Sequence, residues 1–236
     1  MEPVRKIAVH ELVVDRLRRA IHLGDFLPGD RLPAERDIAT RLEVSRESVR
    51  EAIRVLEAEG YVASRRGAAG GHAVTALSEP VARNMARLRP DFKQIVQLME
   101  FRHATECLAA RLAAERRSAD DLECLARAVE ALKTAGEIPR FRKADANFHL
   151  AVAVAARNPH VERAIVDARE AIFLLHGKRD YALVLHTTIA AHRDIFEAIA
   201  ARDPERAEAA MGHHIDVALD EIRFALSDEA ESLSLR

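Results

Sequence analysis

The chain has 236 residues, with 36 Lys+Arg against 38 Asp+Glu and a formal net charge of −2. This near balance excludes a polycation that binds nucleic acid through its overall charge, so any basic contact surface must be local. Two cysteines are too few for a disulfide framework, and neither a signal peptide nor an apolar run of membrane-spanning length is visible. We therefore expect a cytoplasmic protein without membrane contact, large enough for two domains.

The segment from residue 32 to residue 60 predicts two short helices around a tight turn. The first helix is expected over residues 34–42, and Glu43 and Val44 form the turn. Ser45 is placed to cap the second helix, since a serine oxygen at this position accepts a hydrogen bond from a free amide of the first turn. This pattern is typical of a helix-turn-helix that reads DNA.

Three arginines share one face of the second helix. Arg46, Arg50 and Arg54 lie at i, i+4 and i+8, as the contacts of a recognition helix in a major groove would require. The alternative is a solvated face on which these arginines pair with nearby glutamates. The glutamates available for that pairing are Glu47, Glu51 and Glu57.

The residues after this helix favour DNA binding. Two strand-like runs, 60–64 and 72–76, enclose the basic and glycine-rich stretch 65–71, which predicts a hairpin wing. A hairpin tip without bulky side chains can approach a phosphate backbone or enter a minor groove.

Residues 7–76 resemble the winged helix-turn-helix of the GntR family of bacterial transcription regulators. The matching segments are Gly24-Asp-Phe-Leu-Pro-Gly29, Glu35-Arg36, Val44-Ser-Arg46, Val49-Arg-Glu-Ala52 and Leu56 to Gly60. The resemblance implies DNA contacts at Arg36, Ser45, Arg46, Ser48, Arg50, Arg66 and Gly67. Glu43 departs from the pattern, because such turns often carry glycine.

The chain from Ser78 onward is alanine-rich, poor in glycine and helical in its apolar period, which predicts a helical bundle. Helix starts are marked by the capping box Ser118-Ala-Asp-Asp121 and by Asn158-Pro159 and Asp203-Pro204. Helices are expected over residues 79–89, 91–117, 119–135, 139–157, 159–176, 181–202 and 204–227. The predicted fold is mainly α, with a winged helix-turn-helix in residues 1–77 and an all-α bundle in residues 78–236.

One carboxylate and three imidazoles fall on apolar helix faces, whereas His186 and His213 fall on polar faces. The four inward residues are Asp145, His149, His192 and His214. A single inward histidine is more often an ordinary core residue than a ligand. Four buried polar groups are unfavourable unless they share a partner, and this set suits a divalent transition metal with open coordination positions.

Residues 90–228 resemble the FCD ligand-binding domain of FadR-type GntR regulators. The matching segments are Arg102 to Glu106, Asp145-Ala-Asn-Phe-His149, Asn158-Pro159, His192-Arg-Asp-Ile-Phe-Glu-Ala198 and Ala210-Met-Gly-His-His214. The resemblance implies that Asp145, His149, His192 and His214 hold a metal beside the effector. We expect zinc, with nickel, manganese or cobalt as alternatives.

Arg102 and Glu106 lie four residues apart on an apolar stripe. Either they form a buried ion pair that fixes the helix, or Arg102 clamps an anionic effector while Glu106 orients it. Arg163 and Arg169 are expected at the surface.

The whole pattern predicts a homodimeric regulator that is not an enzyme. We expect a repressor that a small carboxylate releases from an inverted-repeat operator. One alternative is a regulator that senses the metal itself. Another is a metal-dependent hydrolase, which is disfavoured because no further inward Glu or His is placed as a general base.

Overall fold

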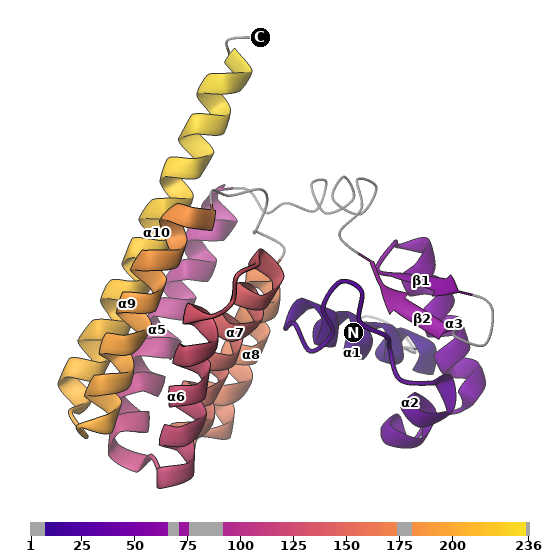
Figure 1. Cartoon of the computed structure of the whole chain (residues 1–236), viewed down its shortest axis with the longest axis horizontal. Coiled ribbons are helices and arrows are strands. Elements are labelled where there is room, and N and C mark those ends of the chain that lie inside the picture. The colour runs from indigo at the N-terminus through magenta and orange to yellow at the C-terminus, as the bar shows by residue number, and fades with distance from the viewer. Residues whose placement is uncertain (1–7, 66–70, 76–91, 174–180, 235–236) are drawn as a thin grey trace, which may run out of the picture. The chain divides into compact units, whose positions relative to one another are not determined.

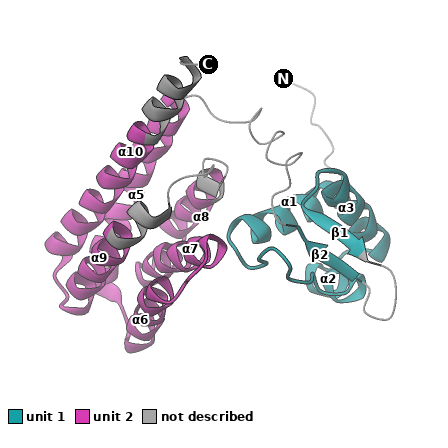
Figure 2. Cartoon of the chain, turned by 45° about the horizontal axis from the view of Figure 1, so that its top comes forward, with its two compact units in different colours: residues 1–89 teal, residues 90–236 magenta. Residues whose placement is uncertain are grey.

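The computed structural model describes residues 8–65, 71–75, 92–173 and 181–234 (Figure 1). The chain forms two compact units, residues 1–89 and residues 90–236 (Figure 2). The helix expected over residues 79–89 and the expected domain boundary after residue 77 lie outside the described residues. The described part is mainly helical with one small hairpin, as predicted.

The N-terminal unit contains three helices and a two-stranded antiparallel sheet. The elements are α1 (Val9–His22), α2 (Glu35–Leu42), α3 (Arg46–Ala58), β1 (Val62–Arg65) and β2 (Gly71–Val74). Val62 pairs with Val74 in the sheet, and both are buried against the helices. Val49, Ala52, Ile53 and Leu56 recur at helical spacing on α3 and form the core of this unit, because each is at most 1% exposed.

The turn between α2 and α3 has the geometry of a helix-turn-helix. Glu43 adopts the left-handed conformation, with φ of 55°. This conformation is unfavourable by about 1 kcal/mol for a residue with a Cβ, so the departure from glycine is tolerated at a small energetic cost. Ser45 caps α3, because its hydroxyl accepts from the amide of Ser48 at 3.0 Å.

The second unit is a bundle of long helices in its described residues. They are α5 (Phe92–Arg116), α6 (Ala119–Lys133), α7 (Ile138–Ala155), α8 (Pro159–Phe173), α9 (Tyr181–Ala200) and α10 (Pro204–Ser234). Each begins within one residue of its predicted start. The predicted caps are present: Ser118 and Asp121 form the capping box, Asn158 accepts from the amide of His160, and Asp203 accepts from that of Arg206.

Helix α5 forms the centre of the bundle and packs against α7, α8, α9 and α10 (Figure 1). Four alanines of α5 are completely buried: Ala109, Ala110, Ala113 and Ala114. Small side chains allow neighbouring helices to approach closely, which places residues of three other helices within reach of one another. None of the helices in the described ranges is both long and apolar enough to cross a membrane.

The two cysteines lie in contrasting environments. Cys107 is buried on α5, and burial together with Glu208 and other nearby carboxylates raises the pKa of its thiol to about 12. Cys124 is exposed on α6.

Candidate metal centre and nucleic-acid interface

Three helices bring Asp145, His149, His192 and His214 together in the bundle. Asp145 and His149 lie one turn apart on α7, His192 lies on α9, and His214 lies on α10. One ligand atom from each residue lies within 4.8 Å of all the others. The predicted grouping is therefore present in the structure, although the four residues span 70 positions of the sequence.

The distances between the donor atoms fit a metal ion. The Nε2 atoms of His192 and His214 are 3.2 Å apart, and those of His214 and His149 are 3.3 Å apart. Tetrahedral zinc at roughly 2.0–2.1 Å from each nitrogen would separate two such ligands by about 3.3 Å. The Oδ1 atom of Asp145 lies 3.4 Å from Nε2 of His192 and completes the group.

Burial separates the three clustered histidines from His213, as the helical period predicted. His149, His192 and His214 are 1%, 0% and 7% exposed, whereas the adjacent His213 is exposed. The side chain of His186 lies outside the described residues. The assignment of His213 to the polar face is therefore confirmed.

The protonation states suit a metal site. Burial, followed by the neighbouring His214 and His149, lowers the pKa of His192 well below its ordinary value. Burial and His149 lower the pKa of His214 to about 3. Burial would raise the pKa of Asp145, but Arg169 and the nearby histidines outweigh it and hold that pKa well below the usual range. Neutral imidazoles and an ionised carboxylate are the forms that bind metal.

A buried ion pair supports the site from α5. Nε of Arg102 donates to Oε1 of Glu106 at 2.6 Å, and the two side chains are 4% and 1% exposed. The other carboxylate oxygen of Glu106 contacts Nδ1 of His149. A carboxylate at Nδ1 fixes the proton there, so that the Nε2 lone pair of His149 faces the other ligands.

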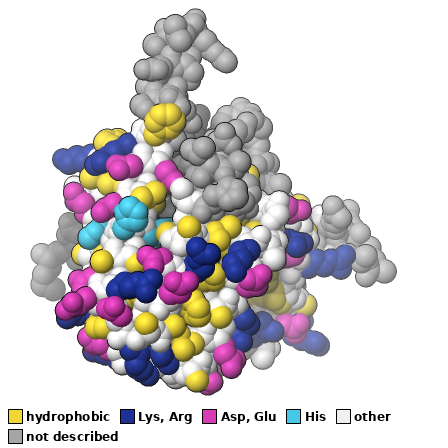
Figure 3. Space-filling model, turned by 60° about the vertical axis from the view of Figure 1, so that its left-hand side comes forward, with side chains coloured by type: hydrophobic (Ala, Val, Ile, Leu, Met, Phe, Trp, Pro, Cys, Tyr) yellow, Lys and Arg dark blue, Asp and Glu magenta, His cyan; other side chains and the backbone are white. Residues whose placement is uncertain are grey.

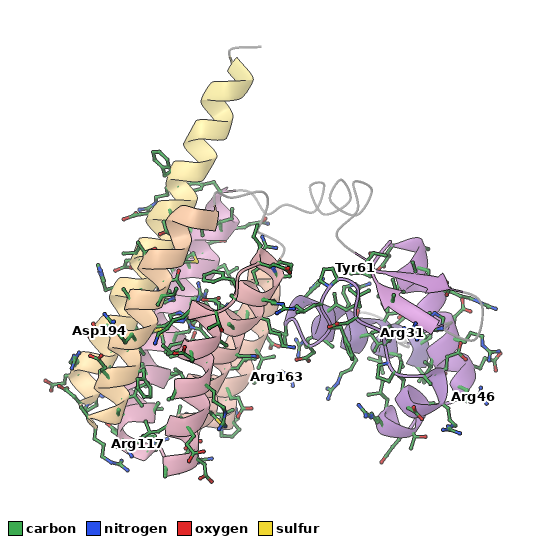
Figure 4. The ribbon with its side chains drawn as sticks, viewed as in Figure 1. Arg31, Arg46, Tyr61, Arg117, Arg163 and Asp194 are labelled. Carbon is green, nitrogen blue, oxygen red and sulfur yellow. The ribbon has the colours of Figure 1, made fainter. Side chains whose placement is uncertain are left out.

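Arg169 was predicted to lie at the surface, and this prediction is wrong. Its side chain on α8 is 7% exposed and donates to Oδ2 of Asp145. The sequence signal was present, because Arg169 continues the buried stripe of Val161 and Ile165 at intervals of four residues. Arg163 is exposed as predicted (Figure 4), and its Nε atom lies 3.5 Å from Oδ2 of Asp167.

The predicted DNA-contacting residues at the start of α3 and on α2 lie at the surface of the N-terminal unit. Arg36 and Arg46 are exposed, and Arg46 projects from the start of α3 (Figure 4). The side chains of Ser45 and Ser48 lie 2.9 Å apart, oxygen to oxygen, at the same helix end. Arg66 and Gly67 of the expected wing tip lie outside the described residues.

Glutamates pair with two of the three arginines on α3. Arg54 contacts Glu51 at 3.1 Å, as the alternative of a solvated face required. Arg50, with 53% of its side chain exposed, instead contacts Glu35 of α2 at 3.1 Å. The other oxygen of Glu35 lies 3.7 Å from Nε2 of His72 on β2.

His72 connects the hairpin to the recognition helix. Its Nδ1 lies 2.8 Å from the hydroxyl of Ser64 on β1 and 3.8 Å from Glu57 of α3. Sequence reasoning missed the contacts of Glu35 with Arg50 and with His72, because only the tertiary fold brings these segments together. The charge pattern of α3 alone gave no signal for these contacts.

One face of the helical unit carries mixed charge. On the face shown in Figure 3, basic and acidic side chains are interspersed with apolar ones. Such a face lacks the single-sign field that attracts nucleic acid.

Comparisons with known proteins agree with this two-part architecture. The sequence matches the family model described as "Bacterial regulatory proteins, gntR family" over residues 10–70, and the "FCD domain" over residues 97–217. It is 34% identical over 209 residues to the HTH-type transcriptional regulator LutR of Bacillus subtilis (strain 168), covering 81% of this chain and 91% of the relative.

The chain is also similar to a second curated regulator and to a solved structure. The chain is 30% identical over 227 residues to the Exu regulon transcriptional regulator of Escherichia coli (strain K12), covering 92% of this chain and 85% of the relative. E. coli McbR/YncC shares the fold with a TM-score of 0.54 at 19% identity, covering 94% of this chain and 100% of the other. These curated relatives are transcription regulators and not enzymes. The chain belongs to the GntR family and is a DNA-binding transcription regulator with a C-terminal FCD domain.

Proposed function

We propose that this chain is a homodimeric repressor that a small carboxylate, bound beside a divalent metal ion, releases from an inverted-repeat operator. DNA binding belongs to residues 1–77 and effector binding to residues 78–236. The convergence of three buried imidazoles and one carboxylate beside a buried arginine carries the proposal. The metal ligands are Asp145, His149, His192 and His214.

Zinc is the ion we expect in this site. Imidazole nitrogen and carboxylate oxygen suit zinc, and the spacing of the Nε2 atoms fits its bond lengths. Nickel, manganese and cobalt accept the same donors, so cellular supply also influences which ion occupies it. A bound ion that expanded its coordination beyond these four side chains would polarise and hold a carboxylate oxygen.

Arg102 is the side chain that we propose binds the carboxylate of the effector. Its Nε is engaged by Glu106, whereas its Nη2 has no hydrogen-bond partner among the described residues although it is buried. A buried guanidinium nitrogen without an acceptor is unfavourable, and a carboxylate would satisfy it with a charge-assisted bond. Glu106 holds Arg102 and His149 together, so it would orient both the anchor and a metal ligand.

The DNA contacts that we propose are those of the family motif. They are Arg36, Ser45, Arg46, Ser48, Arg50, Arg66 and Gly67. A symmetric dimer presents two recognition helices and therefore reads an inverted repeat. An effector that binds the DNA-free arrangement more tightly weakens operator binding by that difference in affinity, and the operator weakens effector binding equally.

Fluorescence anisotropy on an operator selected from random-sequence DNA tests the proposal. The chain is measured free of metal, with zinc, and with zinc plus small carboxylates. We expect tight binding with zinc, and release only when a carboxylate is added. Release by zinc alone would instead identify a metal sensor, and unchanged operator affinity under all conditions would contradict effector control.

A further inference from the structure

The charges buried around the metal ligands balance one another. Arg102 and Arg169 each carry one positive charge, and Glu106 and Asp145 each carry one negative charge. The histidines must be neutral to offer their Nε2 lone pairs. A divalent ion in this site would therefore bring two positive charges that no described side chain in contact with the cluster neutralises.

Beside the candidate metal ligands, two buried guanidinium nitrogens lack acceptors among the described residues. Nη2 of Arg102 and Nε of Arg169 have no hydrogen-bond partner within the described ranges. Nη1 of Arg102 meets only a weak acceptor there, the thioether sulfur of Met99 at 3.6 Å. The two arginines are close enough to affect each other electrostatically. Burial lowers the pKa of Arg102, Glu106 opposes this, and the positive charge of Arg169 lowers the pKa further.

The most exposed member of this cluster lies beside Arg169. Asp145 is its least buried member, with 17% of its side chain exposed, and Arg169 contacts that carboxylate. This pair is more exposed than the pair of Arg102 and Glu106, whose side chains are 4% and 1% exposed.

We propose that the effector is a dianion, a small dicarboxylate, with one carboxylate on Arg102 and the other at Arg169 and the metal ion. This inference rests on the proposed function and adds the charge of the ligand and a second anchor. A dianion would neutralise the two uncompensated charges and supply an acceptor to each unpaired nitrogen. A monocarboxylate leaves one charge uncompensated in a buried site, where this is most unfavourable.

Isothermal titration of the zinc-loaded chain with matched acid pairs tests the inference. Malonate, succinate and glutarate are compared with propanoate, butyrate and pentanoate, in which a methyl group replaces one carboxylate. We expect dicarboxylates to bind roughly tenfold more tightly or better, the effect of one charge-assisted hydrogen bond. Equal affinities in the wild-type chain would overturn the dianion.

Substitution of Arg169 then identifies the second anchor. Arg169→Gln should reduce the ratio of dicarboxylate to monocarboxylate affinity by roughly tenfold, whereas Arg169→Lys, which keeps the charge, should retain most of it. Arg163→Gln on the exposed face of α8 is the matched control and should leave the ratio unchanged. Zinc content is measured for every variant.

The ratio separates anchoring from a structural role. A residue that only positions Asp145 would weaken both acid classes equally, so an unchanged ratio in Arg169→Gln would overturn the assignment of Arg169. Monocarboxylates that bind as tightly as dicarboxylates and release the operator would leave the proposed function intact and remove the dianion. Binding of neither class would contradict both.

Discussion

Replacing Glu106 by glutamine should destabilise the helical unit. The glutamine keeps the shape but removes the charge that compensates Arg102, whose Nε lies 2.6 Å from Glu106 in a pair that is almost fully buried. Removing one partner of a buried pair costs about 3–5 kcal/mol, because the other charge stays behind. For a domain of this size each kcal/mol lowers the melting temperature by roughly 2–4 °C, so we expect a fall of about 6–20 °C.

The same substitution should weaken metal binding. The amide nitrogen of glutamine would donate to Nδ1 of His149, which the carboxylate of Glu106 now contacts. The imidazole proton would then move to Nε2 and point at the other ligands. Loss of such a supporting contact typically reduces metal affinity about 10–100-fold.

Two measurements check these effects. Thermal unfolding in chelator gives the stability of the metal-free chain, and competition with a chromogenic zinc chelator gives the metal affinity. Glu100→Gln, at an exposed position on α5, is the control and should behave as wild type. Wild-type metal affinity in Glu106→Gln would refute the tautomer argument, and an unchanged melting temperature in chelator would refute the role of the ion pair.

Four further expectations concern the proposed metal ligands, acid stability and DNA reading. His214→Ala should lose the metal while His213→Ala retains it, and equal metal content by elemental analysis would refute the assignment of faces. Because the pKa of His214 is lowered to about 3 in the folded chain, the unfolded chain binds that proton more tightly. The metal-free chain should therefore lose stability as the pH falls from about 6.5 toward 3. Thermal unfolding at several pH values should show a shallower loss for His214→Gln. Arg50→Ala should weaken operator binding by about 1–3 kcal/mol and relax base preference at one position. Glu35→Gln removes the ionic contact of 3.1 Å that holds Arg50, so it should change the base preference of the chain more than its affinity for unrelated DNA. If anisotropy competition finds the same base preference in this variant and in the wild type, Glu35 does not position Arg50.

The sequence predicted the helix starts and the ligand faces well because both depend on local rules. Side-chain caps mark the starts of α6, α8 and α10, since free amides need acceptors wherever the helix begins. The 3.6-residue period separates His213 from His214, because a rotation of about 100° takes one to solvent and the other to the core. Neither result requires knowledge of the neighbouring helices.

The features that the sequence did not predict depend on contacts between distant segments. Arg169 lies on an apolar stripe, but a guanidinium in the core is rare unless a carboxylate meets it, and Asp145 comes from another helix. The contact of Arg50 with Glu35 needs the angle between α2 and α3. Helix α10 continues to Ser234, past its predicted end at residue 227, because no glycine or proline follows to end it.

The contrast between the two cysteines makes the natural chain selectively modifiable. Thiol reagents react with the thiolate, so Cys107, buried and with a pKa of about 12, should resist a maleimide at neutral pH. Cys124 is exposed on α6 and should take up one dye. The chain has no third cysteine, so a fluorophore can be attached at a single known position without any substitution. Mass spectrometry of the labelled chain should find one adduct, located on the peptide that contains Cys124.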